Sequence, residues 1–169
     1  MDELAAWRGK IDATIAAEIT NNEPLRLYQA VRHLPEAGGK RLRPLIAMLA
    51  CSAVGGNPDD AVPYGAALEI LHTFTLVHDD IMDDDDIRRG RPSVHRAFDE
   101  ATAILAGDTL FAIAFEITTA EHLPAAVGRT LAHNIATMAR EICEGQQLDM
   151  SFEERADVSE ELFLTMIEK

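Results

Sequence analysis

Residues 66–86 read AALEILHTFTLVHDDIMDDDD and join an apolar helical segment to a dense acidic end. Six carboxylates fall within the eight positions from Asp79 to Asp86. On a helix, Asp79 and Asp83 lie four residues apart on one face, with Asp80 three residues before Asp83. Like charges at this spacing weaken a helix, and acidic residues at its C-terminal end oppose the helix dipole.

A divalent cation compensates for this repulsion. Hard Mg²⁺ takes carboxylate oxygens and keeps several waters and phosphate oxygens as its other ligands. The acidic run also follows the most apolar helical segment of the chain, which predicts carboxylates at the mouth of a buried cavity. Asp79, Asp80 and Asp83 are therefore candidate Mg²⁺ ligands, and a solvated acidic helix end is the alternative.

The rest of the chain also has helical patterns. Apolar residues at helical spacing, with Gly and Pro confined to a few places, predict helices over 4–19, 24–34, 39–53, 58–83, 100–120, 124–145 and 159–169. No stretch alternates polar and apolar residues with a period of two, so we expect no sheet. We also find no repeat, linker or domain boundary, and expect residues 1–169 to form one all-α helical bundle.

Composition limits the partners of this domain. The 29 acidic and 15 basic residues give a net charge of −14, which argues against nucleic acid or an anionic membrane surface. The N-terminus lacks a signal-peptide pattern, and the apolar run Leu45–Val54 is far shorter than the roughly 20 residues that span a bilayer. Cys51 and Cys143 are expected to be buried, reduced thiols. We therefore expect a cytoplasmic protein without a membrane span.

Two basic clusters accompany the acidic run. Gly38–Pro44 reads GGKRLRP, and Arg88–Pro92 reads RRGRP. Glycines permit a close backbone approach, and Lys and Arg side chains suit phosphate oxygens. Each cluster alone is weak evidence, because solvated charge or simple charge balance explains it equally well. Beside a candidate metal site, however, the two together indicate a diphosphate ligand.

These motifs, in this order, resemble those of the trans-prenyltransferases, the polyprenyl diphosphate synthase family of the isoprenoid synthase fold. The residues that carry the resemblance are Gly38–Pro44, His72, Asp79–Asp83, Arg88–Gly90 and Gly145–Asp149. The resemblance implies a Mg²⁺-dependent, head-to-tail condensation of isopentenyl diphosphate with an allylic diphosphate. It covers the N-terminal part of a complete synthase, because the second aspartate-rich motif of the family is absent. We therefore expect a bundle that is incomplete at its C-terminus.

The resemblance also implies a role for each motif. The metal ligands are expected to be Asp79 and Asp83, with Asp80 in support. Arg88 and Lys169 contact the allylic diphosphate, and Gln146 and Asp149 lie near the reacting carbons and metals. The residues expected to hold isopentenyl diphosphate are Lys40, Arg43, His72 and Arg89. The catalytic set is then Asp79, Asp83, Lys40, Arg88 and Gln146.

His72 also has a purely structural interpretation, since a lone histidine on an apolar helix is more often a core residue than a ligand. It lies seven residues before Asp79, almost two helical turns away and on the same face. This placement favours the phosphate-binding role. His78, His95 and His133 lack such support and are expected to be structural or surface residues.

Product length in this family is set by bulk just upstream of the first aspartate. Phe74, Thr75 and Leu71 lie five, four and eight residues before Asp79. One large aromatic beside a small residue is similar to the short-chain synthases, with a C20 product first and C15 next. Helical projection nevertheless places Thr75 and Leu71 nearer the Asp79 face, so Phe74 as a plain core residue is the alternative.

Other interpretations stay open. The chain is alternatively a fragment or a non-catalytic subunit that needs a partner to complete the site, and in isolation it is expected to turn over poorly. A plain cation binder has no need of Lys40, Arg43 and Arg88 together, and a terpene cyclase holds no isopentenyl diphosphate at Gly38–Pro44. The resemblance further implies a homodimer.

Overall fold

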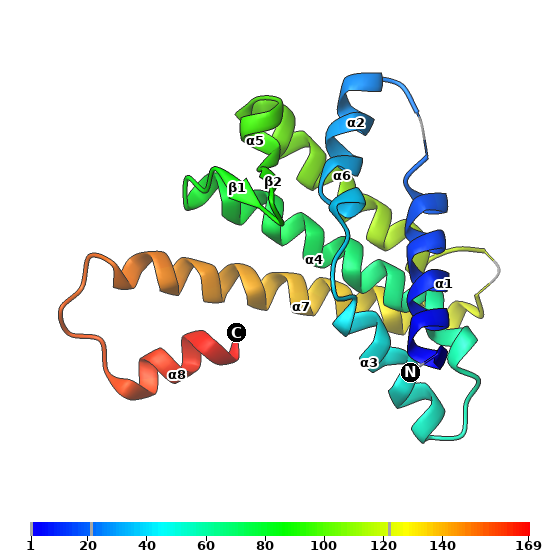
Figure 1. Ribbon diagram of the computed structural model, residues 1–169. Coiled ribbons are helices and arrows are strands. Elements are labelled where there is room, and N and C mark those ends of the chain that lie inside the picture. The colour runs from blue at the N-terminus through cyan, green and yellow to red at the C-terminus, as the bar shows by residue number, and fades with distance from the viewer. Residues whose placement is uncertain (1, 21, 122) are drawn as a thin grey trace.

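The computed structural model describes residues 2–20, 22–121 and 123–169, which are all-α apart from one short hairpin (Figure 1). The helices are α1 (Asp2–Glu18), α2 (Leu25–His33), α3 (Leu42–Ala53), α4 (Val62–Met82), α5 (Val94–Ala97), α6 (Glu100–Thr118), α7 (Ala125–Phe152) and α8 (Glu160–Glu168). Two 3₁₀ turns, η1 (Pro35–Ala37) and η2 (Pro58–Ala61), precede α3 and α4. Strands β1 (Ile87–Arg88) and β2 (Arg91–Pro92) pair antiparallel.

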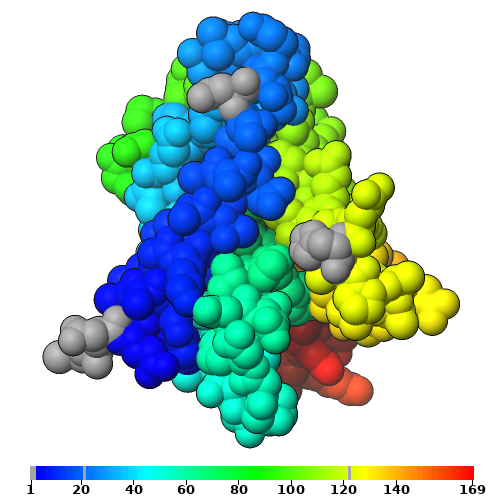
Figure 2. Space-filling model, turned by 90° about the vertical axis from the view of Figure 1, so that its right-hand side faces the viewer, coloured from blue at the N-terminus to red at the C-terminus, as the bar shows by residue number. Residues whose placement is uncertain are grey.

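Helices α4 and α6 form the centre of the bundle and share its most extensive helix–helix contact. Helices α1 and α3 pack against α4, and α2 packs against α6. Helices α1 and α2 lie on one face of the molecule, beside later segments of the chain (Figure 2). Helix α7 contacts α6 and α4, and α8 folds back along α7 (Figure 1). The site described below lies along α4, the helix that contacts most of the others.

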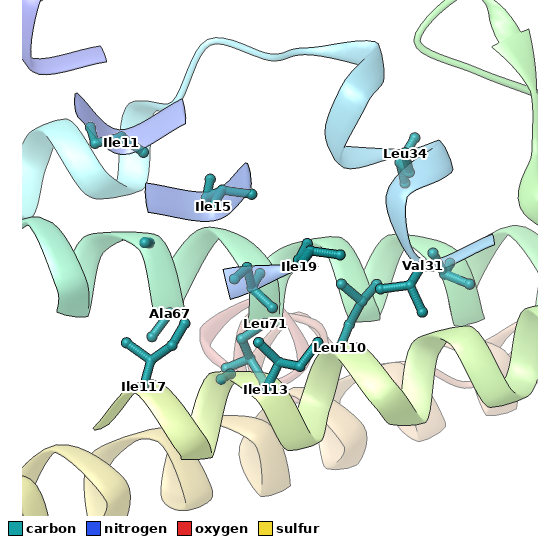
Figure 3. Close-up of a cluster of buried hydrophobic side chains, with 14 of the residues drawn as sticks. Ile11, Ile15, Ile19, Val31, Leu34, Ala67, Leu71, Leu110, Ile113 and Ile117 are labelled. Carbon is teal, nitrogen blue, oxygen red and sulfur yellow. The ribbon is translucent and has the colours of Figure 1, made fainter. Parts of the chain in front are cut away.

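The core follows from stripes of apolar residues at helical spacing. Ile11 and Ile15 lie within α1 and Ile19 directly follows its last residue; the three are spaced four residues apart, and all are buried. Figure 3 shows them above the side chains of α4 and α6, with Leu71 and Leu110 between the layers. Burying each such aliphatic side chain contributes about 1.5–3 kcal/mol. This stripe holds α1 against the helix that carries the acidic run.

The expected helices are confirmed, with two differences. The expectation that the chain has no sheet was wrong, because residues 87–92 form a β-hairpin. Its turn has φ of 52° at Arg89 and 76° at Gly90. A two-residue strand is too short for an alternating pattern to reveal it. Helix α7 also continues past the expected end at Gly145 to Phe152. Gly145 is buried against α8, where an added Cβ would lie 3.0 Å from Lys169, so it serves close helix packing.

Helix α6 has the composition of a membrane span, and one expectation, the burial of the cysteines, needs correction. Helix α6 is long and apolar enough to cross a membrane by length and composition, although no unbroken apolar run marks it. Its packing accounts for that composition, because Ala106, Leu110 and Ile113 are buried in the core. Both cysteines are free, as expected, but Cys143 is exposed and Cys51 is only partly buried.

Candidate active site

The aspartates of the acidic run fall into two groups. Arg96 pairs with Asp84 at 2.7 Å and with Asp86 at 2.5 Å, and Arg88 pairs with Asp85 at 2.9 Å. In the described part of the chain, no hydrogen bond or ion pair reaches the carboxylates of Asp79 or Asp83. Asp79 lies in the last turn of α4 and Asp83 is its C-cap residue, so the two are one turn apart. The structure thus leaves free two of the three carboxylates that the sequence analysis assigns to metal, Asp79 and Asp83.

The chemistry of this pair fits Mg²⁺. Burial, and secondarily the nearby Asp83 carboxylate, raise the pKa of Asp79 to about 6. A divalent cation offsets both effects, because it neutralises the pair and replaces lost hydration. The residues that the structure describes contain no ready cluster of three acidic, His or Cys ligands. Mg²⁺ does not require one, since it commonly takes one or two carboxylates together with waters and phosphate oxygens.

Asp80, unlike Asp79 and Asp83, has a charged partner in the described ranges. Its side chain is fully buried, and one of its oxygens accepts a hydrogen bond from Nε of Arg88 at 2.6 Å. Nη2 of Arg88 lies 2.5 Å from the same oxygen. Burial raises the pKa of Asp80, and the Arg88 guanidinium opposes that shift. Asp80 therefore anchors Arg88 through Oδ1, whereas its buried Oδ2 has no hydrogen-bond partner among the described residues, and its supporting role toward a metal stays a prediction.

A basic pocket of about 560 Å³ lies beside α4. Its lining brings together the residues expected to hold isopentenyl diphosphate, namely Lys40, Arg43, His72 and Arg89, together with Arg88. Lys40 and Arg43 are exposed, and within the described ranges neither has an ion-pair partner. Burial, and then the positive charge of Arg43, lower the pKa of His72 to about 4. His72 is thus neutral at pH 7 and available as a hydrogen-bonding group.

The hairpin explains how two arginines reach this pocket. Arg88 ends β1, and the left-handed turn at Arg89 and Gly90 reverses the chain. Arg88 then faces the buried Asp80, while Nη1 of Arg89 donates hydrogen bonds to the carbonyl oxygens of Leu34, at 3.4 Å, and Gly38. The hairpin therefore ties the acidic end of α4 to the loop before α3.

An apolar cavity of about 390 Å³ opens on the other side of Asp79, between α4, α6 and α7. Its lining includes Phe74, Thr75, Asp79, Met82, Ile104, Ile142, Gln146 and Met150. Gln146 is therefore placed as predicted. Asp149 is exposed and does not line the cavity, and Lys169 pairs with Glu144 between α7 and α8. The structure brings neither Asp149 nor Lys169 to the free aspartates.

The three residues expected to limit product length separate in the structure. Phe74 and Thr75 both line the cavity that contains Asp79. Phe74 also lines a second cavity of about 480 Å³ and packs against Phe111 with ring centroids 5.2 Å apart. Leu71 is buried in the core, 1% exposed, and does not line this cavity, so its part in limiting product length stays a prediction (Figure 3).

The sequence analysis missed two residues that the pocket uses. Arg41 and Glu69 are buried beneath it and form an ion pair of 3.1 Å. Arg41 belongs to the Gly38–Pro44 motif, from which only Lys40 and Arg43 are predicted to bind the ligand. Glu69 had a detectable signal, because a lone acidic residue inside an apolar helical stretch needs a partner when it is buried.

His78 lines the apolar cavity and packs against Phe74 with ring centroids 4.8 Å apart. It was expected to be a structural or surface residue, and its contact with Phe74 shows that it also shapes the cavity.

The fold and site together define a class of protein: a helical bundle with a free aspartate pair over an apolar cavity and a basic pocket beside it. Such an arrangement suits diphosphates that carry apolar chains. A family model described as Polyprenyl synthetase matches residues 24–169, and the chain belongs to this family.

Individual relatives agree with this assignment. The chain is 48% identical to the short chain isoprenyl diphosphate synthase of Methanothermobacter thermautotrophicus, covering 100% of this chain and 52% of that protein. It is also 48% identical to the geranylgeranyl diphosphate synthase of Methanosarcina mazei, with the same coverage. The solved geranylgeranyl pyrophosphate synthetase of Geoglobus acetivorans superposes with a TM-score of 0.93 at 45% identity, over 97% of this chain and 54% of that one. The chain spans about half the length of the curated relatives it matches.

Proposed function

We propose that this chain carries the substrate-binding half of a short-chain trans-prenyl diphosphate synthase, which condenses isopentenyl diphosphate with an allylic diphosphate. The observation that carries the proposal is the selective freedom of Asp79 and Asp83 beside paired neighbours, over an apolar cavity. The relatives' names support the reaction class, and two of those compared are named as geranylgeranyl synthases. We accordingly assign a C20 product first and C15 next.

The residues divide the reaction between two diphosphates. Lys40, Arg43, His72 and Arg89 bind isopentenyl diphosphate in the basic pocket. Arg88 contacts the allylic diphosphate, since its Nη1 has no partner in the described residues after Asp80 and Asp85 take Nε and Nη2. Mg²⁺ held by Asp79 and Asp83 supplies Lewis acidity toward the oxygens of the departing diphosphate.

The cavity protects the reacting carbon. As the allylic carbon–oxygen bond breaks, the double bond of isopentenyl diphosphate forms the new carbon–carbon bond, and a proton leaves its C2 position. The positive charge that develops on the allylic carbon is sensitive to water. The apolar walls formed by Phe74, Met82 and Ile142 exclude water from it, and the neutral Gln146 lies in the same lining.

The acidic run provides a matched experiment. Asp79→Asn and Asp83→Asn each remove a free carboxylate, whereas Asp86→Asn removes one that pairs with Arg96. Binding of a prenyl diphosphate with Mg²⁺, measured by titration calorimetry, is expected to weaken at least tenfold in the first two variants and to stay unchanged in the third. Equal losses in all three would refute the assignment of the metal to Asp79 and Asp83.

A second candidate is a subunit or fragment that binds substrates without completing the reaction. Exposed apolar side chains on α3 and α8, including Ile46 at 55% and Ile167 at 63%, favour a missing partner surface. Incubation with labelled isopentenyl diphosphate, an allylic primer and Mg²⁺ separates the two. Chain-length analysis detects product for a catalytic chain, while binding without product identifies the subunit or fragment.

The proposal includes a cytoplasmic location and a homodimer. Leu105 on the outer face of α6 is 57% exposed, which supports a contact surface there. Sedimentation equilibrium is expected to show a dimer for the wild-type chain and a monomer for Leu105→Glu. A wild-type monomer at micromolar concentration would remove the homodimer from the proposal.

A further inference from the structure

Glu69 is a carboxylate in a pocket that is otherwise built for anions. It is 3% exposed and lines the basic pocket together with Lys40 and His72. A negative charge there repels a diphosphate, so electrostatics alone favour an apolar or amide side chain at this position. The contacts of Glu69 show what offsets this cost.

Both contacts of the carboxylate are arginines in the wall of the pocket. Nη1 of Arg41 donates a hydrogen bond to Oε1 of Glu69 at 3.1 Å, and Nη2 of Arg89 lies 3.7 Å from the same oxygen. These arginines come from the loop before α3 and from the β-hairpin, whereas Glu69 belongs to α4. One buried oxygen thus joins three separate segments of the chain.

The backbone at both arginines is strained. Arg41 has φ of 51° and Arg89 has φ of 52°, a left-handed conformation that residues with a side chain rarely adopt. Such a conformation persists only where surrounding contacts over-determine it. Arg41 also donates to Asp12 at 2.7 Å and to the carbonyl oxygen of Pro35 at 3.0 Å, so its guanidinium is held on every side.

The same arginines hold the loop that carries Lys40. Nη1 of Arg89 donates a hydrogen bond to the carbonyl oxygen of Gly38. A Cβ at Gly39 would lie 3.3 Å from Arg41 Nη1 and 3.3 Å from Arg89 Cζ, so the backbone there rests on both guanidiniums. Lys40 follows directly and is exposed to the pocket.

We infer that Glu69 is a positioning residue for isopentenyl diphosphate: it orients Arg89 directly, and Lys40 through Arg41 and the Gly38–Gly39 loop. This inference rests on the proposed function, because it takes the basic pocket as the isopentenyl diphosphate site. Glu69 acts through these cations and does not contact the ligand. Its own repulsion of the diphosphate is outweighed by the correct placement of two cations.

The charge of Glu69 makes the test sharp, because the two explanations predict opposite signs. Glu69→Gln removes a negative charge next to the ligand, so electrostatics alone predict tighter binding of isopentenyl diphosphate. Positioning predicts binding that is at least tenfold weaker. Affinity is measured by calorimetry in metal-free buffer, which isolates the basic pocket from the aspartates. Asp59→Asn is the matched control, since it deletes the same charge from an exposed pair with Lys10.

A second variant separates positioning from stability. Glu69→Gln leaves Arg41 with one fewer buried partner, which is destabilising, whereas replacing a buried ion pair by apolar residues is often neutral. The charge-neutral double variant Arg41→Met/Glu69→Leu removes both members of the buried pair but also the bonds of Arg41 to Asp12 and Pro35. It is therefore expected to fold, with a lower unfolding temperature than wild type, and to bind isopentenyl diphosphate at least tenfold more weakly. Faster amide hydrogen exchange at Gly39 and Lys40 is expected in both variants.

The outcomes are distinct. Wild-type affinity or tighter binding in Glu69→Gln, or in the double variant if the single one does not fold, overturns the positioning role and leaves the proposed function standing. If wild-type protein fails to bind isopentenyl diphosphate, the proposed function falls and this inference falls with it. Equally weakened binding in Asp59→Asn would show that the loss is not specific to the buried Glu69 contacts and would overturn the inference.

Discussion

Phe74 separates two cavities, and its removal is expected to join them. The ring lines the cavity of about 390 Å³ that contains Asp79 and the neighbouring cavity of about 480 Å³. Phe74→Ala is therefore expected to connect the two cavities and to enlarge the apolar space beside Asp79. One further prenyl unit buried there is worth several kcal/mol at about 0.8 kcal/mol per methylene, less the entropy of ordering the chain.

The variant also has a stability cost that the structure allows us to size. Phe74 loses aromatic contacts with His78 and Phe111, at centroid distances of 4.8 and 5.2 Å, each worth about 0.5–1.5 kcal/mol. With the lost burial of a partly exposed ring, we expect about 2–3 kcal/mol. In a domain of this size that lowers Tm by about 5–10 °C. The folded variant is thus suitable for binding measurements at 25 °C.

The assay measures affinity for prenyl diphosphates of C10, C15, C20 and C25 length in the presence of Mg²⁺. Wild-type affinity is expected to fall once the chain outgrows the first cavity, whereas Phe74→Ala gains at least tenfold for the longest ligands. Phe115→Ala is the control, because it loses a similar aromatic contact with Phe111 but lines neither cavity. An unchanged length preference in Phe74→Ala, or the same gain in Phe115→Ala, would refute the reasoning and leave Phe74 as a core residue.

Three other predictions concern Leu71, Arg88 and His72. Leu71→Ala is expected to cost about 2–5 kcal/mol in urea unfolding without changing length preference, because Leu71 is a core residue; a changed preference would return it to the cavity wall. Arg88→Met leaves the buried Asp80 carboxylate without a charged partner and is expected to lower the free energy of unfolding by about 3 kcal/mol. The double variant Asp80→Asn/Arg88→Met is expected to recover part of this loss. Equal stability of the two variants would show that Asp80 does not need Arg88. His72 titrates near 4 in the folded state and near 6.5 when unfolded, so the unfolded chain takes up its proton first and stability falls as pH drops from 6.5 to 4. Urea unfolding of wild type and His72→Gln at pH 7.5 and 5 isolates this effect from that of Asp79, whose raised pKa changes stability in the opposite direction. The same change in stability with pH in both proteins would contradict the role of His72.

Local patterns are enough for the helices and for placing Asp79 and Asp83 on one helix face. Helical periodicity and Gly or Pro breaks predict α4 and α6 because each is a property of neighbouring residues. Asp79 and Asp83 share a helix face whatever the rest of the chain does, and His72 lies almost two turns before them. The basic motifs, read together with these aspartates, were likewise sufficient to indicate a diphosphate.

What the sequence determined by itself is therefore the set of elements and the chemical groups they carry. Tertiary structure decided which groups are free to act, because pairing and burial depend on residues far apart in the chain. Packing placed Leu71 in the core and Phe74 between two cavities, although both precede Asp79 on one helix. The hairpin directed Arg88 to Asp80, and only the meeting of α4, the loop before α3 and the hairpin gave Glu69 its two arginines.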